Sequence, residues 1–160
     1  MAGEAKTQRL VDVRLDEKTL VRRKPEVEHE RAIAIYDLLE ENYFHPAGDL
    51  TGPFTLVIRL EENRLLLDIG DPAGAELTEV ALPMTPFRTI IKDYFLVCES
   101  YYSAIKRSTP SQIEAIDMGR RGLHNEGSAL LRERLDGKID IDHETARRLF
   151  TLVCILHIRG

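Results

Sequence analysis

The sequence has few of the features that mark a secreted or membrane-bound protein. Its 160 residues include no tryptophan and two cysteines, Cys98 and Cys154, which lack the close spacing typical of metal sites and disulfide frameworks. Residues 1–10 lack the apolar core of a signal peptide, and the most apolar stretch, residues 149–158, is half as long as the roughly 20 residues needed to span a bilayer. We therefore expect a cytoplasmic protein with buried thiols and no membrane partner.

Motifs that would identify a reaction are also absent. The chain contains no His-x-x-x-His, no Cys-x-x-Cys, no phosphate-binding Gly-x-x-x-x-Gly-Lys and no Gly-x-Ser-x-Gly. These patterns supply metal ligands, phosphate-binding amides or an activated nucleophile, so the sequence offers no support for those types of catalysis. We expect neither a metal nor another cofactor, and we favour binding over enzymatic activity.

The charge is unevenly distributed along the chain. The net charge is −5, but residues 1–80 hold 10 Lys/Arg against 17 Asp/Glu, whereas residues 81–160 hold 12 against 10. A protein that coats nucleic acid needs a basic domain, so this balance argues against general nucleic-acid binding. The balance in residues 81–160 is compatible with a local basic patch there.

Hydrophobic periodicity predicts one domain at residues 9–160, preceded by a disordered segment at residues 1–8. The predicted strands cover residues 10–15, 54–60, 64–69 and 77–82, and the predicted helices cover residues 26–43, a stretch that starts at Thr85, residues 110–135 and residues 143–158. This order indicates an α+β fold: an antiparallel sheet of about four strands, with one N-terminal helix and three C-terminal helices packed on it. The last helix has almost no polar face and should be the central buried element.

The most unusual stretch is residues 116–127, which contains three glycines, two arginines and a histidine where the flanking pattern predicts a helix. In an unbroken helix, Arg120 projects into the apolar sector, with His124 at its edge beside Asp117, Arg121 and Ser128. A desolvated guanidinium needs a counter-charge. Two sources are open: a carboxylate of the chain, for which Asp93, Glu99 and Glu144 are candidates, or the phosphate or carboxylate of a ligand.

The same stretch has a second interpretation, because each interior glycine costs a helix about 1 kcal/mol relative to alanine. If the helix breaks, Gly119-Arg-Arg-Gly122 becomes a tight loop that resembles the Gly-x-x-Gly loop of K-homology domains, which clamps an RNA backbone. The order of elements departs from that fold, since no strand after the second helix completes the sheet. RNA-backbone binding through Gly119 and Gly122 is therefore an alternative hypothesis.

We predict a non-catalytic binding or regulatory protein that recognises an anion on a phosphorylated small molecule or a protein partner. The predicted ligand-binding residues are Arg120, Arg121, His124 and Asn125. One alternative is a structural or regulatory module for protein–protein contacts, including a homo-oligomer. Another is an enzyme that uses His124 as acid or base, which requires a carboxylate or hydroxyl within about 3 Å of the ring and an adjacent cavity.

Long stretches of the chain also resemble a known family. These include Thr85-Pro-Phe-Arg-Thr-Ile-Ile-Lys-Asp-Tyr-Phe95, Cys98-Glu-Ser-Tyr-Tyr102, Ser111-Gln-Ile-Glu-Ala-Ile-Asp-Met-Gly-Arg-Arg-Gly-Leu-His-Asn-Glu-Gly127 and Thr145-Ala-Arg-Arg-Leu-Phe150. On them the chain is similar to uncharacterised protein family 0262, small proteins found mainly in alphaproteobacteria, over nearly its full length after residue 8. The resemblance implies a bacterial cytoplasmic protein and brings no activity with it.

Overall fold

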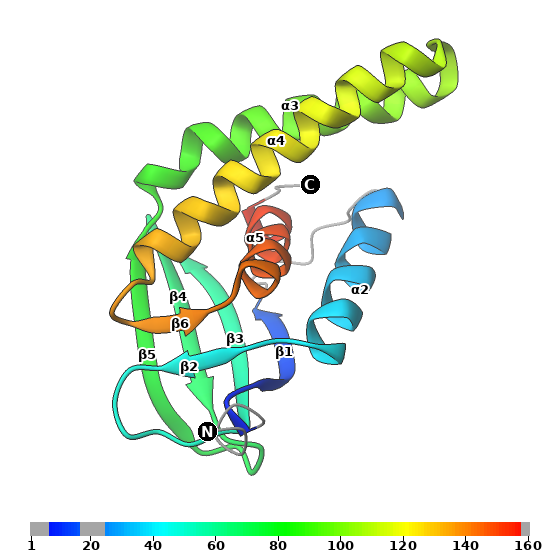
Figure 1. Ribbon diagram of the computed structural model, residues 1–160. Coiled ribbons are helices and arrows are strands. Elements are labelled where there is room, and N and C mark those ends of the chain that lie inside the picture. Colours follow the sequence, from blue (N-terminus) through cyan, green and yellow to red (C-terminus); the bar gives the residue numbers. More distant parts are fainter. Residues whose placement is uncertain (1–6, 17–24, 158–160) are drawn as a thin grey trace.

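The computed structural model describes residues 7–16 and 25–157, so residues 1–6 of the predicted disordered segment lie outside the described residues. Gln8, the last residue of that segment, is buried, and its side-chain amide donates a hydrogen bond to the carbonyl oxygen of Leu50. The described elements are shown in Figure 1: β1 (Leu10–Asp16), α2 (Pro25–Glu40), β2 (Phe44–Pro46), β3 (Phe54–Glu61), β4 (Arg64–Gly70), β5 (Glu76–Pro83), the 3-10 turn η1 (Thr85–Phe87), α3 (Arg88–Arg107), α4 (Pro110–Arg134), β6 (Ile139–Ile141) and α5 (His143–His157).

The main sheet has the strand order β1-β3-β4-β5 and is mixed. Strands β3, β4 and β5 form the predicted antiparallel meander, but β1 runs parallel to β3, so the prediction of a purely antiparallel sheet is wrong for its first strand. The reason is the connection, because helix α2 lies between β1 and β3 and brings the chain back to the end of the sheet at which β1 began. The α+β class itself is confirmed.

A second, two-stranded sheet pairs β2 with β6 in antiparallel register, with Phe44 opposite Ile141. The sequence-based prediction did not include either strand. Each is three residues long, which is too short to show the alternation that identifies a strand. The buried side chains of Phe44, Ile139 and Ile141 join the main core through this pair.

Helix α5 is the central buried element, as predicted from its apolar composition. It packs against α2, α4 and β3, and Figure 1 shows it in red between the sheet and the paired helices α3 and α4, which extend beyond the rest of the fold. Phe150, Leu152 and Cys154 on α5 are each at most 1% exposed, and Cys98 on α3 is 7% exposed, so the prediction of buried thiols is confirmed. None of the described helices is both long and apolar enough to cross a membrane.

Helix α4 is continuous over 25 residues, despite its glycines. Its start carries the predicted capping box: the Gln112 amide donates to the Thr109 hydroxyl, and the Thr109 amide donates to the Gln112 side chain. The choice between helix and loop at Gly119 and Gly122 is thereby settled as helix. Since the intervening amides belong to the helix, the K-homology-like loop does not form, and the RNA-binding alternative loses the structural feature on which it was based.

Asn42 ties the end of α2 to β1. Its side-chain carbonyl accepts from the Leu10 amide at 2.7 Å, and its side-chain amide donates to the carbonyl oxygens of Leu10 and Leu38 at 3.0 and 2.7 Å. An Asn42→Ala variant leaves these backbone groups without partners, so we expect a loss of about 2 kcal/mol in the free energy of unfolding, measured by urea denaturation. Asn63→Ala, which removes exposed contacts to Thr85 and Arg88, is the control and should cost less than about 1 kcal/mol.

Candidate functional site

A cavity of about 290 Å³ lies between helices α2, α4 and α5. Four arginines line it: Arg120 and Arg121 from α4, and Arg147 and Arg148 from α5. We call this space the arginine cavity. Its remaining polar lining comes from His124, Thr151, Tyr94, Glu144 and two acidic residues of α2, Glu30 and Asp37.

The two basic helices present the same arrangement of charge to the arginine cavity. On α4 an acidic residue is followed by arginines three and four positions later and by His124 at position seven; on α5 the same spacing leads from Glu144 to Thr151. Residues at these spacings share one face of a helix, so each helix aligns one carboxylate, two guanidinium groups and one neutral polar side chain. The sequence-based prediction did not include the α5 set, although its repeat of the α4 spacing was the signal that could have found it.

On α4, Asp117 supplies the counter-charge that Arg120 was predicted to need. The Nε and Nη2 atoms of Arg120 lie 3.0 and 2.6 Å from Asp117 Oδ1, and Arg121 Nε lies 3.1 Å from Asp117 Oδ2. None of the three predicted carboxylates is the partner. Burial disfavours the charged form of Arg120, but the hydrogen bonds to Asp117 outweigh it, and the pKa of Arg120 is raised above its usual value. One carboxylate thus serves two guanidinium groups.

The surroundings of Arg120 hold its side chain in place. Its guanidinium carbon lies 5.0 Å from the centre of the Tyr101 ring, within the range of a cation–π contact. The Arg120 side chain is 25% exposed, whereas that of Arg121 is 55% exposed. Arg120 is therefore a packed part of the cavity wall, and Arg121 is the more exposed of the two arginines.

On α5, Glu144 takes the place that Asp117 has on α4. Its carboxylate oxygens lie 3.5 Å from Arg147 Nη1 and 3.3 Å from Arg148 Nη1. The Nε of Arg147 is buried and has no hydrogen-bond partner among the described residues. Buried donors are nearly always paired, so Arg147 has unused hydrogen-bonding capacity in this arrangement.

His124 and Thr151 join the two helices at the cavity wall. His124 Nε2 lies 2.6 Å from Thr151 Oγ1, and the imidazole packs between the rings of Tyr94 and Phe150, with both centroids at 5.4 Å. The Thr151 hydroxyl also donates to the carbonyl oxygen of Arg147, which leaves its lone pairs to accept from Nε2–H. Burial, followed by the charges of Arg147 and Arg120, lowers the pKa of His124 to about 4, so the ring is neutral at pH 7.

Two predicted features of the site have different outcomes. The hydroxyl and the cavity that an acid–base role of His124 requires are both present, although a neutral ring with a pKa near 4 is a weak base at pH 7. Asn125 is exposed and does not line the arginine cavity, because it lies 100° around the helix from His124. The structure therefore brings together Arg120, Arg121 and His124 and leaves Asn125 apart.

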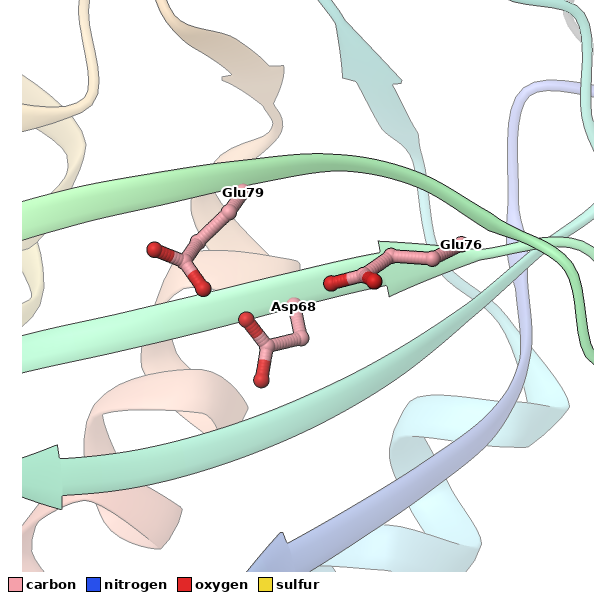
Figure 2. A group of neighbouring side chains, drawn as sticks. All are labelled: Asp68, Glu76 and Glu79. Carbon is pink, nitrogen blue, oxygen red and sulfur yellow. The ribbon is translucent and has the colours of Figure 1, made fainter.

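A separate acidic group lies on the main sheet, where Figure 2 shows Asp68 on β4 beside Glu76 and Glu79 on β5. Their carboxylate oxygens lie within 4.8 Å of one another, a spacing at which a metal ion could be held. Arg59 already occupies this position, with Nε 2.7 Å from Asp68 and Nη2 2.8 Å from Glu79. The arrangement is an ion-pair network around an arginine, and a cation would have to displace it.

Comparisons of the sequence with known proteins identify a family of relatives. The sequence profile of the Uncharacterised protein family (UPF0262) matches residues 7–159. A UPF0262 protein of Paramagnetospirillum magneticum is 65% identical over 96% of this chain and 98% of its own length. Relatives from Rhodospirillum rubrum, at 64% identity over 99% and 98%, and from Brucella anthropi, at 58% over all of both chains, carry the same family name. No solved structure matches this chain.

Proposed function

We propose a function for this chain, which belongs to the uncharacterised protein family UPF0262: it binds a small molecule that carries a phosphate or carboxylate group, and it does so in the arginine cavity. The observation that carries this proposal is the sharing of carboxylates. Asp117 pairs with both Arg120 and Arg121, and Glu144 pairs with both Arg147 and Arg148, so these ion pairs leave a net charge of +2 on the α4 and α5 walls. An anion supplies the missing negative charge.

The chemistry of the donors favours an oxyanion. A guanidinium binds phosphate and carboxylate through two parallel N–H donors, and four guanidinium groups line this cavity. The cavity volume of about 290 Å³ is at the lower end of the range for ligand pockets, which suits a small molecule. His124, neutral and hydrogen-bonded to Thr151, acts here as a positioning residue that joins α4 to α5.

Inorganic phosphate is the first probe of this proposal. At about 100 times its dissociation constant it should stabilise the fold by roughly 2.7 kcal/mol, which for a chain of this size raises the melting temperature by about 5–10 °C. A double variant, Arg147→Gln with Arg148→Gln, should weaken phosphate binding at least tenfold. These side chains are better targets than Arg120, because removing them leaves Glu144 exposed near the start of a helix, where a negative charge is favourable.

Arg134→Gln is the matched control, since it removes one positive charge from α4 outside the arginine cavity. It should leave the phosphate-dependent shift of the melting temperature intact. An unchanged melting temperature of the wild-type protein with phosphate and citrate, or an equal shift in the double variant, would contradict the proposal.

A protein-interaction module is the second candidate, and the surface of α2 favours it. Ile33 and Tyr36, three residues apart on one helix face, are 45% and 65% exposed, and Ile33 borders the arginine cavity. Sedimentation distinguishes the two candidates. A homo-oligomer or co-purifying partner at low micromolar concentration would favour this module, and a strict monomer that responds to phosphate would favour the anion site.

A further inference from the structure

The wall of the arginine cavity opposite the arginines is acidic. Glu30 and Asp37 lie on α2, seven residues apart and therefore on one side of the helix, with Ile33 and Ala34 between them. The charges in the cavity are thus unevenly placed: α4 and α5 carry guanidinium groups with the carboxylates that pair with them, and α2 carries carboxylates alone.

These two carboxylates are not part of the ion pairs that hold the arginines. Asp37 makes no side-chain hydrogen bond or ion pair with any residue that the structure describes, although it is half-buried. Glu30 accepts one hydrogen bond, from the Tyr102 hydroxyl at 2.8 Å, and forms no ion pair within the described part of the chain. The acidic wall therefore faces the cavity with two carboxylates that have no cationic partner among residues 7–16 and 25–157.

A simple anion does not suit both walls, because it gains from the arginines and is repelled by Glu30 and Asp37. We propose that the ligand is zwitterionic: a small molecule with a phosphate or carboxylate group for the arginines and an ammonium group for Asp37 and Glu30. The short apolar strip of Ile33 and Ala34 is suited to the methylene groups that join the two charges. This inference rests on the proposed function, since it names the class of ligand for the same cavity.

The test compares matched probes that differ in the ammonium group alone. Aminoalkyl phosphates with two, three and four carbons are titrated into the 15N-labelled protein, each against the alkyl phosphate of the same length, and affinities are read from amide chemical shifts. At neutral pH the amine is charged. At least one aminoalkyl phosphate should bind fivefold or more tightly than its alkyl partner, with shifts at residues of both α2 and α4.

Asp37→Asn assigns the effect to the acidic wall. This variant should lose most of the preference for the amine, and it should bind the alkyl phosphate at least as tightly as the wild type does, because one repulsive charge is removed. Asp37 is the better target than Glu30, whose bond to Tyr102 gives it a structural role as well. The control is Glu26→Gln, which removes one negative charge from the same helix at an exposed position outside the cavity. It should leave the preference unchanged.

The possible failures are distinguishable. If alkyl phosphates bind and no aminoalkyl phosphate binds more tightly, the zwitterionic ligand is wrong and the anion site stands. If the preference for the amine persists in Asp37→Asn, Asp37 does not recognise the ammonium group and its assignment is wrong. If no probe in either series shifts the cavity residues, both this inference and the proposed function fail.

Discussion

Replacing Gly127 with alanine is expected to destabilise the protein by about 2–3 kcal/mol, measured as the free energy of unfolding in urea. Gly127 lies in α4 directly against the ring of Phe150 on α5. An alanine Cβ at this position would stand 2.5 Å from Cε1 of Phe150 and closer still to Cζ and Cε2. The ring is fully buried and has aromatic neighbours in His124 and Tyr94, so it has little room to move. The two helices must separate or the ring must leave its rotamer.

Gly122→Ala is the matched control on the same helix. Nothing lies within 4 Å of a Cβ built there, so alanine restores helix propensity without a clash and should stabilise the fold by roughly 0.5–1 kcal/mol. A second control combines Gly127→Ala with Phe150→Leu, and the smaller side chain should make the pair less costly than the sum of the single changes. A Gly127→Ala protein as stable as the wild type would show that α4 and α5 do not approach each other as described.

The second large effect is a loss of stability at acidic pH that originates at His124. Above pH 6.5 the imidazole is neutral in both the folded and the unfolded chain, so its contribution to stability is constant. Between pH 6.5 and about 4 the unfolded chain binds a proton that the folded protein, with a His124 pKa of about 4, does not. Stability therefore falls as the pH is lowered through this window, by a total on the order of 3 kcal/mol.

His124→Gln tests the origin of this dependence. The glutamine amide is able to reach the Thr151 hydroxyl, which is the contact of Nε2, but it does not titrate. In thermal or urea unfolding between pH 7 and 4.5, the variant should therefore lose less stability than the wild type. His29→Gln, at an exposed position on α2, serves as the control and should follow the wild-type slope. Parallel pH profiles of wild type and His124→Gln would rule out His124 as the source.

Several elements could be predicted from the sequence because their signals are local. The meander β3-β4-β5, the capping box at Thr109 and Gln112 and the buried α5 follow from alternation, capping chemistry and helical periodicity within short windows. The parallel pairing of β1 and the strands β2 and β6 were missed because strand pairing depends on residues distant in sequence, and β2 and β6 are too short to show a pattern.

Only part of the lining of the arginine cavity was predicted from the sequence. Arg120, Arg121 and His124 were noticed because they lie in a stretch with three glycines where the flanking pattern predicts a helix. The prediction that Arg120 needs a counter-charge is confirmed. The partner was wrong because Asp117, three residues away, satisfies it locally. Arg147 and Arg148 were missed because the repeat of the α4 spacing on α5 was overlooked, and that repeat does not itself show that the two helices line one cavity.

The amino-acid sequence by itself determined the α+β class, the buried thiols and the family, since composition, periodicity and long shared stretches are properties of the chain read in order. The tertiary structure alone decided that α4 continues through its glycines. Glycine has a low helix propensity, but at Gly127 the close contact with Phe150 leaves no space for a side chain. The tertiary structure also decided that the arginine pairs of α4 and α5 face the two carboxylates of α2 across one cavity. Electrostatic interactions depend on distance in space and not on position along the chain.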